Sequence, residues 1–127
     1  MKRTALKSGK PPKRRKSPMK ARGRKQRVAD QCGAMWSRLV KAAWDHRCAW
    51  CGAEGSDAHH LIGCGHHATR YELLNGMCLC RKCHGLVHDD ADMKQAFRAW
   101  VVAHHPKLAE WLWEHRRDSV TVSEAWL

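Results

Sequence analysis

The stretch Cys80-Arg81-Lys82-Cys83-His84-Gly85-Leu86-Val87-His88 combines two kinds of potential metal ligand in one short segment. Its Cys-x-x-Cys spacing allows both thiolates to bind one ion from a tight turn. Its two histidines are four residues apart, so on a helix they share a face and can bind a cation together. We therefore expect a helix over residues 81–88 that carries ligands of both kinds.

A second Cys-x-x-Cys pair, Cys48 and Cys51, precedes this stretch. Two such pairs complete the tetrahedral four-sulfur shell that structural zinc prefers, so Cys48, Cys51, Cys80 and Cys83 are predicted to bind Zn²⁺. The chain between the pairs is long enough to hold one hairpin. Cys78 is an alternative ligand, because in a strand it would face the same side as Cys80.

Apolar periodicity and turn residues predict an α+β domain that is mainly helical. A stripe of apolar residues predicts a helix over residues 30–45, capped by Asp30. Short strands are expected over residues 56–62 and 77–79. A loop separates them, and the pair Asn75-Gly76 is a turn signal.

Further helices are expected over residues 91–127. Asp90 or Asp92 can cap the first of them, and Pro106 suits the first turn of the next. A last short turn can start at Thr121 or Ser123. The aromatic residues of this region recur at helical spacing, which predicts core packing rather than base stacking.

Length and composition exclude several classes of protein. The 127 residues fit one domain. No apolar run approaches the roughly 18–20 residues that a membrane span needs, and the basic N-terminus lacks the apolar stretch of a signal peptide. Seven cysteines are an odd number, which argues against a closed set of disulfides. These features predict a cytoplasmic protein that uses its cysteines to bind metal.

The positive charge of the chain is concentrated at its N-terminus. Residues 1–27 contain 13 Lys and Arg and no acidic residue. The formal net charge of the whole chain is +12, so this segment accounts for all of the excess positive charge. This segment is too polar to fold alone, so we expect a disordered arm followed by one domain over residues 28–127. The arm is predicted to neutralise nucleic-acid phosphates, above all through Lys13-Arg14-Arg15-Lys16. A solubilising tail or a targeting signal is the alternative.

The spacing of the histidines resembles the HNH endonucleases. The matching residues are Ala58-His59-His60-Leu61-Ile62, Leu74-Asn75-Gly76 and Cys80-Arg81-Lys82-Cys83-His84. The flanking cysteine pairs resemble the zinc-stapled branch of phage and bacterial HNH proteins, and the last His, at position 88, is similar to that of DNase colicins. The resemblance covers roughly residues 44–90 and implies a ββα-metal core there, with the arm and the C-terminal helices outside it.

By this resemblance the chain is expected to be a metal-dependent DNA endonuclease. The general base would be His60, the residue that holds the loop or the base would be Asn75, and the catalytic ion would be bound by His59, His84 and His88. His59 as the base and Asp57 as a further ligand are alternatives. Imidazole ligands suit Zn, Ni, Co or Mn better than Mg.

The hairpin loop carries further candidate residues, and two other functions compete with that of a nuclease. Arg70 is a candidate phosphate clamp, against a solvated loop charge. His66 and His67 are expected to face solvent, with substrate contact as the alternative. A non-catalytic zinc module that binds nucleic acid would use the cysteines and the arm but not the histidines. A metal-storage or redox protein would have no use for the arm.

Overall fold

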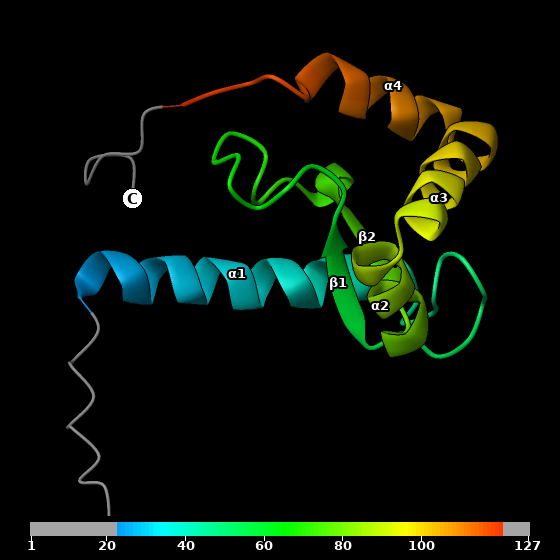
Figure 1. Ribbon diagram of the computed structural model, residues 1–127. Helices are drawn as coiled ribbons and strands as arrows, with labels where there is room; N and C mark the ends of the chain where they lie inside the picture. The colour runs from blue at the N-terminus through cyan, green and yellow to red at the C-terminus, as the bar shows by residue number, and fades with distance from the viewer. Residues whose placement is uncertain (1–22, 121–127) are drawn as a thin grey trace, which may run out of the picture.

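The computed structural model describes residues 23–120, so the predicted basic residues 13–16 and the turn at Thr121 or Ser123 lie outside the described residues. It has the expected α+β, mainly helical character (Figure 1). The elements, in chain order, are α1 (Arg24–Ala43), β1 (Asp57–His60), the 3-10 turn η1 (Leu73–Asn75), β2 (Gly76–Leu79), α2 (Arg81–Asp89), α3 (Ala91–His104) and α4 (Pro106–His115). Within residues 23–120, no helix is both long and apolar enough to cross a bilayer.

The register of the antiparallel pair β1–β2 determines which side each histidine takes. His60 lies opposite Gly76, and His59 lies opposite Met77. Directly opposed residues point to the same face of a sheet, and neighbours along a strand point to opposite faces. His60 and Gly76 therefore face α1, whereas His59 and Met77 face α2 and α3.

Helix α1 packs closely on β2 because position 76 has no side chain. A Cβ atom at Gly76 would lie 2.3 Å from Val40 Cγ2 and 2.8 Å from Cζ2 of Trp36. The indole N–H of Trp44 donates a hydrogen bond of 3.2 Å to the carbonyl of Gly76. These contacts fix the C-terminal half of α1 against the sheet.

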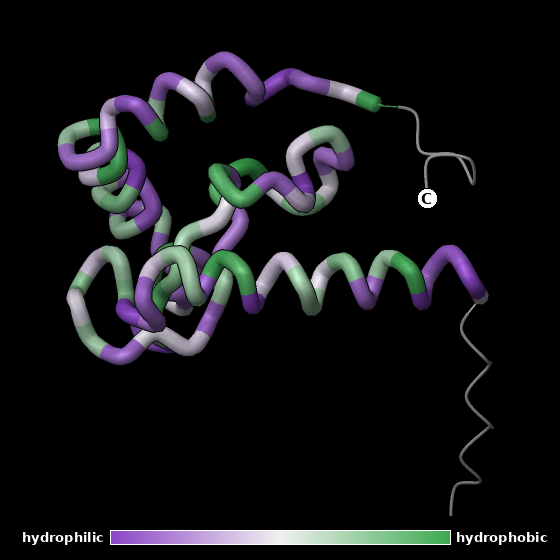
Figure 2. Tube along the Cα trace, turned by 180° about the vertical axis from the view of Figure 1, so that it is seen from behind, coloured by the Kyte–Doolittle hydropathy of each residue, from purple (hydrophilic) through white to green (hydrophobic). Residues whose placement is uncertain are grey.

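The predicted start of the first helix, at Asp30, is wrong. Helix α1 begins at Arg24, and its N-cap is Gly23, which makes no side-chain cap hydrogen bond. Arg, Lys and Gln are good helix formers, so the helix extends back into the segment predicted to be disordered up to residue 27. Figure 2 shows this hydrophilic first turn at the end of α1 far from the sheet.

The hydrophobic core lies on the other face of the sheet, between β2, α2 and α3. Its buried members are Cys48, Met77, Leu79, Cys83, Val87, Phe97 and Val101. Asp90 caps α3, as one of the two predicted caps, and its Oδ1 accepts from the backbone N–H groups of Asp92 and Met93 at 3.0 and 3.1 Å. Pro106 opens α4 as predicted.

The strands and the last helix differ from the prediction in two respects. β1 ends at His60 rather than at residue 62, because the N–H and C=O groups of Ile62 bond to the side chain of Asn75 instead of a strand partner. Core packing is confirmed for Phe97, which is buried, but not for Trp113, of which 67% is exposed.

Candidate metal centres and the adjoining cavity

The structure brings the four predicted cysteine ligands together. Among the described residues, the Sγ atoms of Cys48, Cys51, Cys80 and Cys83 all lie within 4.8 Å of one another. The sulfur atoms of Cys51 and Cys80 are 3.7 Å apart. A tetrahedral zinc site with Zn–S bonds of about 2.3 Å requires sulfur atoms about 3.8 Å apart, so this group can hold such an ion. Cys78, the alternative ligand, is buried outside the group.

Backbone geometry builds both cysteine turns. In the first, the N–H of Gly52 donates to the carbonyl of Cys48 at 2.9 Å, and Gly52 adopts a φ of +77°, which glycine tolerates best. In the second, Cys80 is the N-cap of α2, and its sulfur accepts from the N–H of Cys83 at 3.4 Å. The second pair is thus part of the start of α2.

The thiols of this group differ in their ionisation. Burial raises the pKa of Cys48, but backbone hydrogen bonds from Cys51, Cys80 and Trp50 outweigh it and lower that pKa to about 7. Burial is also the largest influence on Cys83, and there it raises the pKa, together with the neighbouring thiols. A bound cation would favour the thiolate at both positions, since the thiolate is the form that binds metal.

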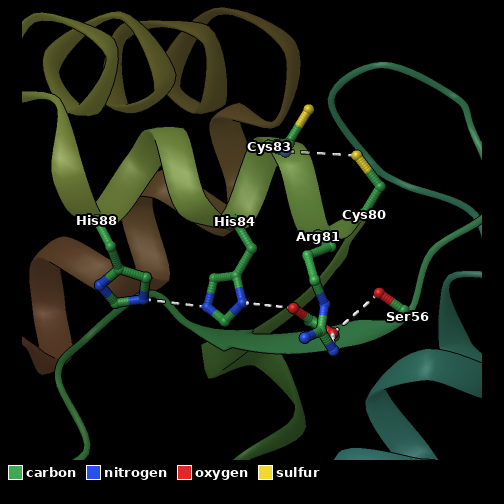
Figure 3. Close-up of polar contacts among 7 residues, drawn as sticks. Ser56, Cys80, Arg81, Cys83, His84 and His88 are labelled. Carbon is green, nitrogen blue, oxygen red and sulfur yellow. Dashed lines mark hydrogen bonds and ion pairs between the residues drawn. The ribbon is translucent and has the colours of Figure 1, made fainter.

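The three predicted histidine ligands form a second group. Ring nitrogens of His59, from β1, and of His84 and His88, from α2, lie within 4.8 Å of one another. The Nε2 atoms of His84 and His88 are 3.0 Å apart, and Figure 3 shows the two rings side by side along α2. Burial, and then the charges of His84 and His88, lower the pKa of His59 to about 4. His59 is therefore neutral near pH 7, as a metal ligand must be.

Asp57 contacts one residue of the histidine group, His84, but does not belong to the group itself. Its Oδ2 lies 2.9 Å from Nδ1 of His84, while its Oδ1 accepts from the Ser56 hydroxyl at 2.9 Å and lies 3.5 Å from the Arg81 guanidinium. The hydrogen bond with His84 is the largest influence on Asp57 and lowers its pKa. Asp57 thus orients His84 with its Nε2 toward the group, and the structure does not support Asp57 as a ligand itself.

His60 is fixed on the opposite side of β1 by α1 and the loop. Its ring stacks on Trp36 with centroids 3.8 Å apart and planes 10° from parallel, and its Nε2 lies 2.9 Å from the carbonyl oxygen of Arg70. Because a carbonyl only accepts, Nε2 carries the proton and Nδ1 is left as the acceptor. Burial lowers the pKa of His60, against the opposing effect of the Arg70 carbonyl.

Asn75 holds the loop, which is one of its two predicted roles. Its side chain is fully buried, and its Nδ2 donates to the carbonyls of Ile62 and Thr69, both at 3.0 Å. Its Oδ1 accepts from the N–H of Ile62 at 2.5 Å. The guanidinium of Arg70, the predicted phosphate clamp, lies 5.4 Å from the Tyr71 ring, and it is the backbone of Arg70 that contacts His60.

His60 and two members of the histidine group, His59 and His88, line one cavity, although His59 and His60 point to different faces of β1. The cavity has a volume of about 640 Å³, and His59, His60 and His88 are among the residues that line it. Residues of α3 and α4 line the rest, among them Lys94, Phe97, Arg98, Trp113 and Arg116.

The sequence pattern did not reveal two residues of this site. Trp36 belongs to the apolar stripe of α1, and nothing in the sequence shows that its ring stacks on His60. Trp113 falls outside the apolar stripe of α4, and this departure from the periodicity is the signal that could have indicated an exposed ring lining the cavity.

Comparison with known proteins gives no match. The chain matches no protein-family profile, no curated protein and no solved structure at a significant level.

Proposed function

We propose that the chain is a metal-dependent DNA endonuclease of the HNH type, which hydrolyses phosphodiester bonds. One observation carries this proposal: His60 lines the same cavity as His59 and His88, which together with His84 form a group that can hold a metal ion. Hydrolysis of a phosphodiester needs a base for the attacking water and positive charge near the phosphate, and this arrangement offers both in one place.

His60 is the general base in this proposal. Its Nδ1 accepts a proton from the attacking water, because Nε2 is already engaged with the Arg70 carbonyl. The parallel stack on Trp36 and that hydrogen bond hold the ring in one orientation. Burial lowers the pKa of His60, which keeps the ring neutral and able to accept a proton near pH 7.

Two ions are proposed, with different roles. Zinc in the cysteine group is structural, since four thiolates close its coordination shell. The histidine group holds a catalytic divalent ion, and three imidazoles suit Zn, Ni, Co or Mn better than Mg. When bound, this ion supplies Lewis-acid stabilisation of the charge that develops on the phosphate and on the leaving oxygen.

DNA is the proposed partner. The N-terminal basic residues, including Lys13-Arg14-Arg15-Lys16, would contact phosphates without selecting a sequence. Arg70, on the loop beside His60, is a further candidate for a phosphate contact. A phage protein, or a bacterial one, that processes DNA in the cytoplasm of the host cell fits these features.

The test is cleavage of plasmid DNA by purified variants, with the bound metals measured in parallel. His60→Ala should stay folded, keep both ions and bind DNA, but cut roughly 10²–10⁴-fold more slowly. His84→Ala should in addition lose affinity for the second ion, so excess metal should partly restore its activity. His104→Ala, which removes an exposed imidazole outside the cavity, should cut like the parent protein.

Other outcomes have defined meanings. If His59→Ala cuts slowly and His60→Ala cuts normally, the two histidines exchange roles. If both variants cut normally, the HNH proposal is wrong. A protein that binds DNA, holds an ion only in the cysteine group and never cuts is instead the non-catalytic zinc module.

A further inference from the structure

The cavity extends beyond the histidines, and its lining combines apolar residues with exposed basic and aromatic ones. It runs from His59 and His88 between α2, α3 and α4 to Trp113 and Arg116. Its volume of about 640 Å³ falls within the range of pockets that enclose small molecules. Metal binding and proton transfer use only the histidine end, so the larger part of the cavity has no role in the chemistry proposed above.

The charged residues that line this cavity are all basic. Lys94 and Arg98 are four residues apart on α3, so they share a face of that helix, and both are exposed. Arg116 follows the end of α4. Among the described residues that line the cavity there is no Asp or Glu. Such basic residues attract an anion into the cavity that His59 and His88 also line.

Trp113 provides an aromatic surface in the same cavity. It is the most exposed of the large apolar side chains in the described residues, at 67%, although it lines the cavity. The guanidinium carbon of Arg116 lies 3.5 Å from the centroid of its ring, so one face of the indole is covered by a positive charge. The other face can accept a second planar group, and nucleobases stack on aromatic side chains in this way.

We propose that this cavity binds one unpaired nucleotide next to the phosphate that is cut, with its base stacked on Trp113 and its phosphates near Lys94, Arg98 and Arg116. The inference rests on the proposed nuclease function and adds a substrate class to it. The enzyme prefers DNA with an unpaired nucleotide, as in a branch, a bulge or a single strand, over continuous duplex. A base that is paired in a duplex cannot enter the cavity, because the opposite DNA strand would also have to fit between α2, α3 and α4.

The test measures binding of labelled DNA by fluorescence anisotropy, in the full-length His60→Ala background so that the DNA is not cut. The probes are a paired duplex, the same duplex with one unpaired nucleotide, and a third in which that nucleotide is abasic. The background protein should bind the unpaired nucleotide best. Trp113→Ala should weaken that binding by roughly 5- to 150-fold, the usual loss for one stacked base, and should leave the abasic probe nearly unaffected.

Matched variants separate stacking from charge. Trp113→Phe keeps an aromatic face and should retain most of the preference. Arg98→Ala should weaken all three probes and reduce the salt dependence of binding. Lys107→Ala removes an exposed charge on α4 that does not line the cavity, and should bind like the background protein.

Three results would overturn the inference. Equal binding of the paired and unpaired probes is one, and an equal effect of Trp113→Ala on the intact and abasic probes is another. The third is a Trp113→Ala variant with altered oligomeric state or melting temperature but unchanged DNA binding, which would mean that protein fills the cavity. Plasmid cutting by the parent protein, and its loss in His60→Ala, are measured separately. The nuclease proposal is therefore tested by cutting, and the proposal of an unpaired nucleotide is tested by binding.

Discussion

Asp57 and His59 lie on the same side of β1, and both serve the histidine group, but in different ways. The alternation of side chains along a strand allowed the sequence to predict that Asp57 is near the site. It could not predict whether the carboxylate would reach the ion or a ligand, because that depends on where α2 lies. In the structure the Asp57 carboxylate contacts Nδ1 of His84, and this contact fixes the tautomer of the imidazole ring.

Loss of Asp57 is expected to weaken the histidine site without affecting the cysteine site. In Asp57→Ala the ring of His84 is no longer oriented, and we expect roughly 10- to 100-fold lower affinity for the second ion. Asp57→Asn keeps an acceptor without the charge and should fall in between. Competition with a chromophoric chelator measures both ions. Glu110→Ala, an exposed carboxylate on α4, is the control, and equal affinities in all variants would contradict this role for Asp57.

At the scale of elements, α1 shows how much of the burial of a helix its apolar pattern can predict. The stripe predicted one buried face, yet only Trp36 and Val40 are buried, while 57% of Met35 and 49% of Leu39 are exposed. The sheet beneath has two strands of four residues within the described chain, so it covers a single row of helix positions four residues apart. The width of the sheet depends on tertiary structure, so the apolar periodicity of the helix cannot predict how much of its apolar face is covered.

Gly76→Ala tests the contact between α1 and β2. The added methyl would overlap Val40 and Trp36, so the helix must move outward, and we expect a loss of about 1–3 kcal/mol in the free energy of unfolding. Urea unfolding measures it. The control is Gly85→Ala in α2, where an added Cβ meets nothing within 4 Å and should stabilise by roughly 0.5–1 kcal/mol. A Gly76→Ala protein as stable as the parent would show that α1 is loosely attached.

Cys80→Ser tests the cysteine group as an element of the fold. This sulfur is both a predicted zinc ligand and the cap of α2, so its loss should release the ion and unfold the domain or lower its melting temperature strongly. Metal content and thermal unfolding followed by circular dichroism report the two effects. Cys64→Ser, at an exposed cysteine outside the group, should change neither. A zinc-free Cys80→Ser protein with normal melting would refute the structural assignment.

At the scale of the whole molecule, the order of elements from β1 to α4 could be predicted, but their arrangement around a cavity could not. The cap at Asp90 and the proline at 106 set the lengths of α3 and α4. The angle at which the two helices meet brings Trp113 back toward His88, and this depends on packing between residues far apart in the sequence. The pattern therefore predicted the residues of both candidate metal groups but not the other residues that line the cavity.

Removal of residues 1–22 should weaken DNA binding about equally for all sequences and flatten its dependence on salt. This segment holds 10 Lys and Arg, and each phosphate that they no longer contact keeps its counterions, so fewer counterions are released on binding. The cut stops short of Arg24 so that α1 stays complete. A chain with residues 1–22 in shuffled order should bind like the parent protein. If the truncated protein keeps the parent's affinity and salt slope, the arm does not contact DNA.

Helix α2 belongs to both candidate metal sites, with Cys80 and Cys83 at its beginning and His84 and His88 along it (Figure 3). If both ions are bound, the histidine ion can leave while the cysteines still anchor the helix. The cysteine ion cannot leave without freeing the cap of α2 and, with it, both imidazoles. Demetallation is thus expected to be ordered. In the proposed nuclease, a weak chelator would give a folded, inactive and readily reactivated protein, whereas a strong chelator would disrupt the histidine group and the fold together.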